Sequence, residues 1–88
     1  MRFHFSGTLL RFTDYRQDLD IDAPTVDAAL KALVVENPAL QPVLFDGKGR
    51  VRSAHRLFVN GDPIGEADLQ KALKPEDTLD IITAIAGG

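Results

Sequence analysis

The chain closes with a stretch whose pattern changes part-way along: Thr78-Leu79-Asp80-Ile81-Ile82-Thr83-Ala84-Ile85-Ala86-Gly87-Gly88. Leu79 and Ile81 alternate with Asp80 and Ile82. This two-residue period is typical of a strand that buries one of its faces. We therefore predict a strand here, with Leu79 and Ile81 in a core and Ile82 on the opposite face.

The residues after Thr83 form a narrow tail. Gly87 and Gly88 have no Cβ, so they add no width to the chain and accept φ of either sign. Residues 84–88 reach roughly 17 Å when extended. Two terminal glycines occur by chance in roughly one chain in 200, and here no linker or charged run separates them from the strand. We predict a domain over residues 1–83 and a flexible tail over 84–88. The tail presents the Gly88 carboxylate as the working group, provided that Gly88 is the native end.

Composition restricts the class of protein. The 88 residues suffice for one domain. The absence of cysteine excludes disulfides, thiolate metal sites and a cysteine nucleophile on this chain. The net charge of −3 argues against a nucleic-acid partner, and no segment has the length and apolarity of a signal peptide or a membrane span. We therefore expect a cytoplasmic protein with neither nucleic acid nor membrane as a partner.

Two strands are predicted in the first quarter of the chain. Phe3 and Phe5 alternate with polar residues, which indicates a strand with both rings inward. Residues 7–10 either continue this strand or begin a turn. Residues 18–22 alternate aspartates with apolar side chains, which predicts a second strand paired with the first in an antiparallel hairpin.

One long helix is predicted after Pro24. Thr25 is suited to the N-cap, and Asp27 places a negative charge in the first turn, where the helix dipole favours it. The helix ends before Pro38, because the residue that precedes a proline avoids the α region. Its apolar residues have the spacing of one buried stripe, formed by Val26, Ala29, Leu30, Leu33 and Val34.

The second half of the chain alternates turns with short elements. Residues 39–45 are predicted to form a short apolar helical turn, and residues 46–49 an exposed loop. The basic stretch that follows is either a solvated loop or a docking face for an acidic partner. It contains Arg50, Arg52, His55 and Arg56.

A third strand is predicted over residues 56–59, where Leu57 and Val59 face inward. The tight-turn pair Asn60-Gly61 ends it. Residues 62–65 are predicted to be irregular, and residues 66–73 to hold a short helical turn. The order of elements predicts an α+β fold in which a sheet of about four strands packs on a single helix.

This order and this ending resemble the ubiquitin-like β-grasp fold. More closely, they resemble the ThiS/MoaD family of sulfur-carrier proteins, in particular the MoaD-like and cysteine-biosynthesis branches. The resemblance spans essentially the whole chain and implies a mixed sheet of about four to five strands packed on one main helix. A proline often precedes the tail in this family, and Thr83 takes that position here. The motifs that carry the resemblance are Pro24-Thr25-Val26, Phe58-Val59-Asn60-Gly61 and Ala84-Ile85-Ala86-Gly87-Gly88.

The resemblance also implies a chemistry at Gly88. An adenylating enzyme of the ubiquitin-activating type (MoeB/ThiF-like) would join AMP to the Gly88 carboxylate. A sulfur donor, either a protein or sulfide, would convert the acyl adenylate into a thiocarboxylate that delivers sulfur to an accepting synthase. Gly87 and Gly88 are then the site residues of this chain, because they fit the narrow path to the partner's active site.

The same resemblance places the cofactors on the partner. ATP and Mg²⁺ would be bound by the adenylating enzyme, and this chain has no phosphate-binding GxxxxGK[ST] motif. His4 and His55 are too few and too far apart in sequence to indicate a metal site. We therefore expect no cofactor on this chain, which acts as a protein co-substrate, or as the small subunit of a synthase complex, rather than as an enzyme.

A docking surface is predicted beside the tail. Phe58 and Ile82 point away from the core on neighbouring strands, and outward apolar patches of this kind often mark protein interfaces. The alternative is that both are scattered surface residues, or are covered by the loop before Phe58. Ala84, Ile85 and Ala86 are expected to contact the partner as they lead into its active site.

Two other functions remain open at this point. A ubiquitin-like modifier would use the same activated Gly88 to form isopeptide bonds with lysines. A passive β-grasp interaction domain would have an inert tail. The sulfur acceptor is also open among a molybdopterin precursor, an activated serine, a thiazole and a specialised metabolite.

Overall fold

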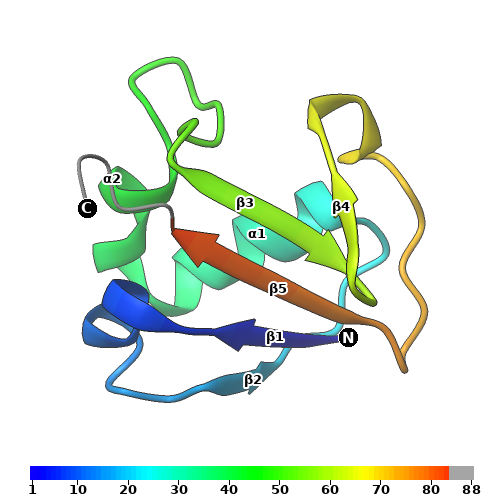
Figure 1. The fold of residues 1–88 in the computed structure, drawn as a ribbon, viewed down its shortest axis with the longest axis horizontal. Coiled ribbons are helices and arrows are strands. Elements are labelled where there is room, and N and C mark those ends of the chain that lie inside the picture. The colour runs from blue at the N-terminus through cyan, green and yellow to red at the C-terminus, as the bar shows by residue number, and fades with distance from the viewer. Residues whose placement is uncertain (84–88) are drawn as a thin grey trace.

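The computed structural model describes residues 1–83, which form a five-stranded mixed sheet with helices on one face (Figure 1). The spatial order is β2-β1-β5-β3-β4. The two central strands, β1 and β5, are parallel, and every other pair is antiparallel. The predicted α+β class is confirmed. The strands are β1 (Arg2–Phe5), β2 (Asp18–Asp20), β3 (His55–Val59), β4 (Asp62–Ile64) and β5 (Thr78–Thr83).

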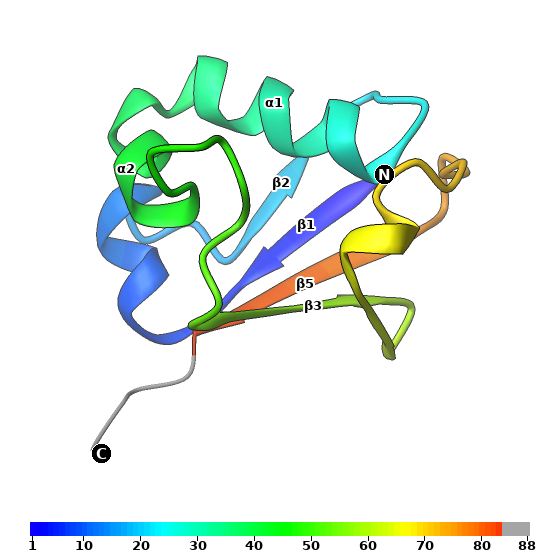
Figure 2. The ribbon, with the colours of Figure 1, turned by 90° about the horizontal axis from the view of Figure 1, so that it is seen from above.

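The main helix, α1 (Val26–Glu36), crosses one face of the sheet (Figure 2). Thr25 is its N-cap, since the Thr25 hydroxyl oxygen accepts a hydrogen bond from the Ala28 amide at 3.1 Å. Asn37 follows the last helical residue and precedes Pro38. The predicted start and end of this helix are both confirmed.

The core lies between α1 and the two central strands. Alternation along β1 buries the rings of Phe3 and Phe5, which stack with their centroids 5.6 Å apart. Leu79 and Ile81 of β5 are also completely buried. They pack with the predicted stripe of α1, in which Val26, Ala29, Leu30 and Leu33 are buried and Val34 is partly buried.

Three short helical segments close the end of the sheet at which β1 stops. After Gly7, which has φ of +64°, the chain turns into the 3-10 helix η1 (Gly7–Phe12). Of the two alternatives for residues 7–10, a continued strand or a turn, the structure shows the turn. The helical turn predicted for residues 39–45 is confirmed up to Leu44, in η2 (Pro38–Leu40) and α2 (Gln41–Leu44), and Phe45 is extended. This segment adds Leu40, Leu44 and Phe45 to the core.

The prediction of irregular structure for residues 62–65 is wrong, because residues 62–64 form strand β4. Asn60 and Gly61 both have positive φ, at 52° and 86°, which is the backbone of the two-residue hairpin turn that joins twisted strands. The turn folds β4 onto β3, where Pro63 pairs with Phe58. Proline has no amide hydrogen, so an inner strand, which bonds to two neighbours, would lose a hydrogen bond at this position. Strand β4 lies at the edge of the sheet and has one neighbour, so Pro63 is tolerated there. The helical turn predicted for residues 66–73 is shorter, as η3 (Glu66–Asp68).

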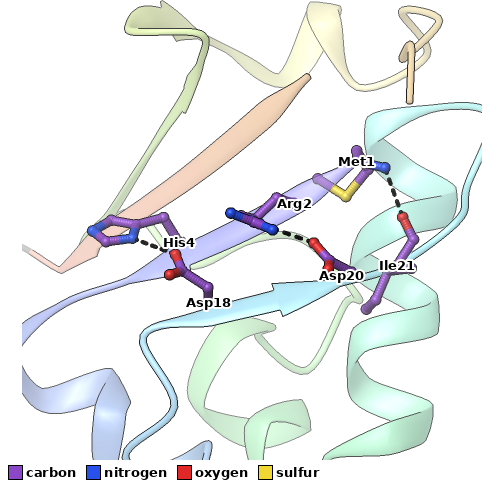
Figure 3. Close-up of polar contacts among 6 residues, drawn as sticks. All are labelled: Met1, Arg2, His4, Asp18, Asp20 and Ile21. Atoms are coloured by element: carbon purple, nitrogen blue, oxygen red, sulfur yellow. Dashed lines mark hydrogen bonds and ion pairs between the residues drawn. The ribbon is translucent and has the colours of Figure 1, made fainter. Parts of the chain in front are cut away.

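Polar pairs join β1 to β2 on the face of the sheet that α1 does not cover (Figure 3). The Arg2 guanidinium donates to Asp20 at 2.9 Å, and His4 Nδ1 lies 2.9 Å from an Asp18 carboxylate oxygen. The Arg2 hydrogen bond and charge lower the pKa of Asp20. Both pairs are solvent-exposed, so each adds little to stability. Beyond β2, the Met1 ammonium donates to the Ile21 carbonyl at 3.0 Å and continues the pairing.

A second polar network secures the entry to β5. The Asp77 carboxylate accepts from the Lys74 amide at 2.8 Å and from the Asn60 side-chain amide at 2.9 Å. Asn60 in turn accepts from the Thr78 amide at 3.0 Å, which ties the β3–β4 turn to β5. The backbone bond from Lys74, followed by the bond from Asn60, lowers the pKa of Asp77 below its ordinary value of 3.8.

This network predicts a loss of stability in acid. A carboxylate with a lowered folded-state pKa stabilises the fold above its ordinary pKa, and this contribution is lost as the pH falls toward the folded-state value. We expect the free energy of unfolding to fall below about pH 4, and to fall less in Asp77→Asn, which has no proton to take up. Urea unfolding of both chains between pH 6 and pH 2.5 measures the difference. If the free energy of unfolding falls equally with pH in the wild type and in Asp77→Asn, Asp77 makes no such contribution.

Candidate functional site

Strand β5 brings the described part of the chain to its end at the centre of the sheet (Figure 1). Its last residue, Thr83, pairs with His55 at the start of β3. Thr83 is therefore the point at which the folded domain meets the predicted tail. The predicted site residues Ala84, Ile85, Ala86, Gly87 and Gly88 lie outside the described residues.

His55 connects this point to α2. The ring is buried, at 8% exposed. Its Nδ1 lies 3.0 Å from the Thr83 hydroxyl oxygen, and its Nε2 lies 2.7 Å from the Val43 carbonyl oxygen. The basic stretch predicted from the sequence includes His55 but identifies neither of its two partners. The signal that could have found it is the alternation of His55, Leu57 and Val59, which extends the inward face of β3 by one position.

Phe58 and Ile82 share the face of the sheet opposite to α1. In the β3–β5 register, Phe58 pairs with Asp80 and Ile82 pairs with Arg56, so Phe58 and Ile82 are diagonal neighbours. Ile82 is 45% exposed, whereas Phe58 is half-buried. The structure therefore brings these two predicted docking residues together, one position before Thr83, and we name them the Phe58–Ile82 patch.

The basic loop (residues 46–54) leads into β3. The Asp46 carboxylate accepts from the Lys48 and Arg50 amides at 2.8 and 3.0 Å, and these bonds lower the pKa of Asp46. Arg52 donates to the Pro42 carbonyl at 2.9 Å. Within residues 1–83, the loop's lysine and arginines form no ion pair. The loop is thus held by bonds between side chains and backbone groups, and its lysine and arginines are exposed.

Comparison with protein families decides which class of protein carries this arrangement. The model of the ThiS family matches residues 4–88, which is nearly the whole chain and includes the terminal glycines. The chain belongs to the ThiS family. No curated protein matches it.

Solved structures resemble this ThiS-family protein over almost its full length. SAMP1 from Haloferax volcanii is 27% identical, with a TM-score of 0.82, and the match covers 99% of this chain and 97% of that one. The small archaeal modifier protein 1 (SAMP1) from Methanosarcina acetivorans is 23% identical, with a TM-score of 0.84 and coverage of 99% and 94%.

A third match, to the BexX/CysO complex from Amycolatopsis orientalis, is 19% identical, with a TM-score of 0.84 and coverage of 99% and 98%. The ubiquitin-like β-grasp fold expected for this ThiS-family protein is confirmed.

Two further observations concern the described residues of this ThiS-family protein. None of its helices within residues 1–83 is long and apolar enough to cross a membrane. In the same part of the chain, no three His, Cys, Asp or Glu side chains are grouped as metal ligands. His4 and His55 instead bond to Asp18 and Thr83, which are parts of the fold.

Proposed function

We propose that this ThiS-family protein is a sulfur carrier whose working atom is the carboxyl carbon of Gly88. The carboxylate attacks ATP on a ThiF/MoeB-like adenylating enzyme, which forms the acyl adenylate and releases pyrophosphate. Sulfide, either free or released by a donor protein, then attacks the acyl carbon. AMP leaves, and the thiocarboxylate carries sulfur to an accepting synthase.

The observation that carries the proposal is the family match, which extends through Gly87 and Gly88. The geometry of the domain supports it. Strand β5 pairs with β1 up to Ile81 and with β3 up to Thr83, so the tail follows the central strand of the sheet. The Phe58–Ile82 patch lies beside that point and offers apolar area for docking the adenylating enzyme.

In this mechanism the chain is a protein co-substrate. Its residues bind the partner and present a carboxylate without side chains on its last two positions, while ATP, Mg²⁺ and the groups that handle protons belong to the partner. The sulfur acceptor follows from the synthase with which the carrier works. A molybdopterin precursor, an activated serine, a thiazole and a specialised metabolite all fit the chemistry of a thiocarboxylate.

A protein modifier is the second candidate, and one observation favours it. The match with the highest identity among those described is SAMP1 from Haloferax volcanii, and the related Methanosarcina acetivorans protein is named as a modifier. A modifier would pass the activated Gly88 to a lysine amine in place of sulfide. Both functions require the same acyl adenylate, so the second step distinguishes them.

Intact-mass spectrometry tests the proposal. We expect incubation with ATP, Mg²⁺, a ThiF/MoeB-type enzyme from the same genome and sodium sulfide to replace one oxygen by sulfur in this chain. Omitting sulfide should leave the acyl adenylate. The mass of the protein isolated from its own cells shows whether Gly88 is the mature terminus. Conjugates of higher mass without a thiocarboxylate would favour the modifier, and the absence of any adenylate would contradict both.

A further inference from the structure

His55 is a buried polar residue at the point where the sheet ends, and its contacts are not required by the carrier chemistry itself. We propose that His55 is a positioning residue that holds Thr83 in the sheet and so sets the point from which the tail continues. The catalytic consequence of this inference rests on the proposed function. The contact itself does not.

The two hydrogen bonds of His55 assign the hydrogen on its ring. A carbonyl oxygen only accepts, so Nε2, at 2.7 Å from the Val43 carbonyl, carries the hydrogen. In the neutral ring Nδ1 is then an acceptor, and the Thr83 hydroxyl donates to it across 3.0 Å. One ring therefore joins the end of β5 to α2.

The α2 side of this connection is anchored by backbone and side-chain bonds. The last carbonyls of a helix lack intrahelical partners, and in α2 each of the four is paired. Gln41 accepts from the Phe45 amide, Pro42 from the Arg52 side chain and Leu44 from the Arg52 amide. Val43 accepts from His55. The Val43 carbonyl is thus held in place, and His55 connects it to the Thr83 hydroxyl.

The position of Thr83 matters because the tail that follows it is short. Strand ends open readily when nothing holds them. Opening of the last pair, His55 with Thr83, would lengthen the segment between the last paired residue and Gly88, and would lower the effective concentration of Gly88 at the partner's active site. A net hydrogen bond of ordinary strength corresponds to a change of roughly two- to tenfold in the population of the closed end.

Four variants test the inference. Thr83→Val keeps the branched shape and removes the hydroxyl, and His55→Gln removes the ring. Thr83→Ser restores a hydroxyl. Thr25→Ala is the stability control, since it removes the N-cap of α1 and so destabilises the fold away from β5. Thr25 pairs with Ala72 and has no contact with β5 in the ladder.

Steady-state thiocarboxylation separates positioning from docking. In Thr83→Val and His55→Gln we expect kcat to fall roughly two- to tenfold, while the Kd for the adenylating enzyme stays unchanged because the Phe58–Ile82 patch is intact. Thr83→Ser should recover most of kcat, and Thr25→Ala should keep it. Unchanged kcat in Thr83→Val and His55→Gln, no recovery in Thr83→Ser, or an equal fall in Thr25→Ala would overturn the inference.

NMR of the free protein tests the contact between His55 and Thr83 in the absence of the adenylating enzyme. We expect the ring nitrogen shifts at pH 8 to show hydrogen on Nε2 of His55 and a bare Nδ1, with Nδ1 shifted in Thr83→Val. Amide exchange at Ile82, which pairs with Arg56, should rise roughly two- to tenfold in that variant, with Leu79 unchanged. Hydrogen on Nδ1 alone, or unchanged exchange, would overturn the inference. A wild-type chain that forms no thiocarboxylate would contradict only the proposed function.

Discussion

Deletion of Gly87 and Gly88 is expected to abolish thiocarboxylate formation while the domain stays folded. The deletion withdraws the terminal carboxylate by about 7 Å along an extended chain. A misplacement of about 1 Å can cost roughly a hundredfold in rate, so we expect a loss of at least about a hundredfold. The rate is measured as the change in intact mass with time, in the presence of ATP, Mg²⁺, the adenylating enzyme and sulfide.

Variants of unchanged length separate the effect of tail length from the effect of side-chain size at Gly87 and Gly88. Gly88→Ala and Gly87→Ala keep the length of the tail and each add one methyl group, so they should retain more activity than the deletion if the path into the active site tolerates a Cβ. The thermal midpoint of the deletion variant should equal that of the wild type, because the deletion leaves the core formed within residues 1–83 unchanged. A deletion variant that still acquires sulfur would show that the tail is not the working group.

Ile82→Glu, alone and combined with Phe58→Glu, is expected to weaken binding of the adenylating enzyme by roughly thirtyfold or more. Central apolar residues of an interface often cost about 2 kcal/mol or more on truncation, and a carboxylate buried without a partner adds to this penalty. Isothermal titration against the adenylating enzyme measures the Kd. The fold should persist in Ile82→Glu, because the Ile82 side chain is 45% exposed.

Val35→Glu provides the matched control for this experiment. Val35 is 77% exposed and lies on α1, on the other side of the sheet from the Phe58–Ile82 patch. The substitution introduces the same charge in place of an aliphatic side chain, and we expect no change in Kd. Equal affinities for Ile82→Glu and Val35→Glu would remove the patch from the interface and leave the scattered-residue interpretation.

Much of the fold could be predicted because it depends on short-range patterns. The alternation of Phe3 with Phe5 and of Leu79 with Ile81 reflects a strand with one buried face, and all four residues are fully buried in the structure. At the N-cap, the Thr25 hydroxyl accepts a hydrogen bond from the Ala28 amide, which is only three residues away in the sequence. Such signals span a few residues, so a single sequence displays them.

The features that sequence reasoning missed depend on neighbours that are distant along the chain. Pro63 argues against a strand in general, and only the edge position of β4 makes it acceptable. His55 stands beside arginines in sequence, where it suggests a basic loop, although its ring is turned into the core. The diagonal placement of Phe58 and Ile82 likewise depends on the register of β3 against β5.

By itself the sequence determined which faces of the main elements are apolar, where α1 begins and ends, and that two glycines follow the final strand without a linker. These properties depend on the period and chemistry of adjacent residues. Only the tertiary structure decided that β5 lies between β1 and β3, and that His55 meets Thr83 across 28 positions of sequence. Pairing of distant segments depends on which arrangement buries the most apolar surface with every polar group bonded, and that is a property of the whole chain.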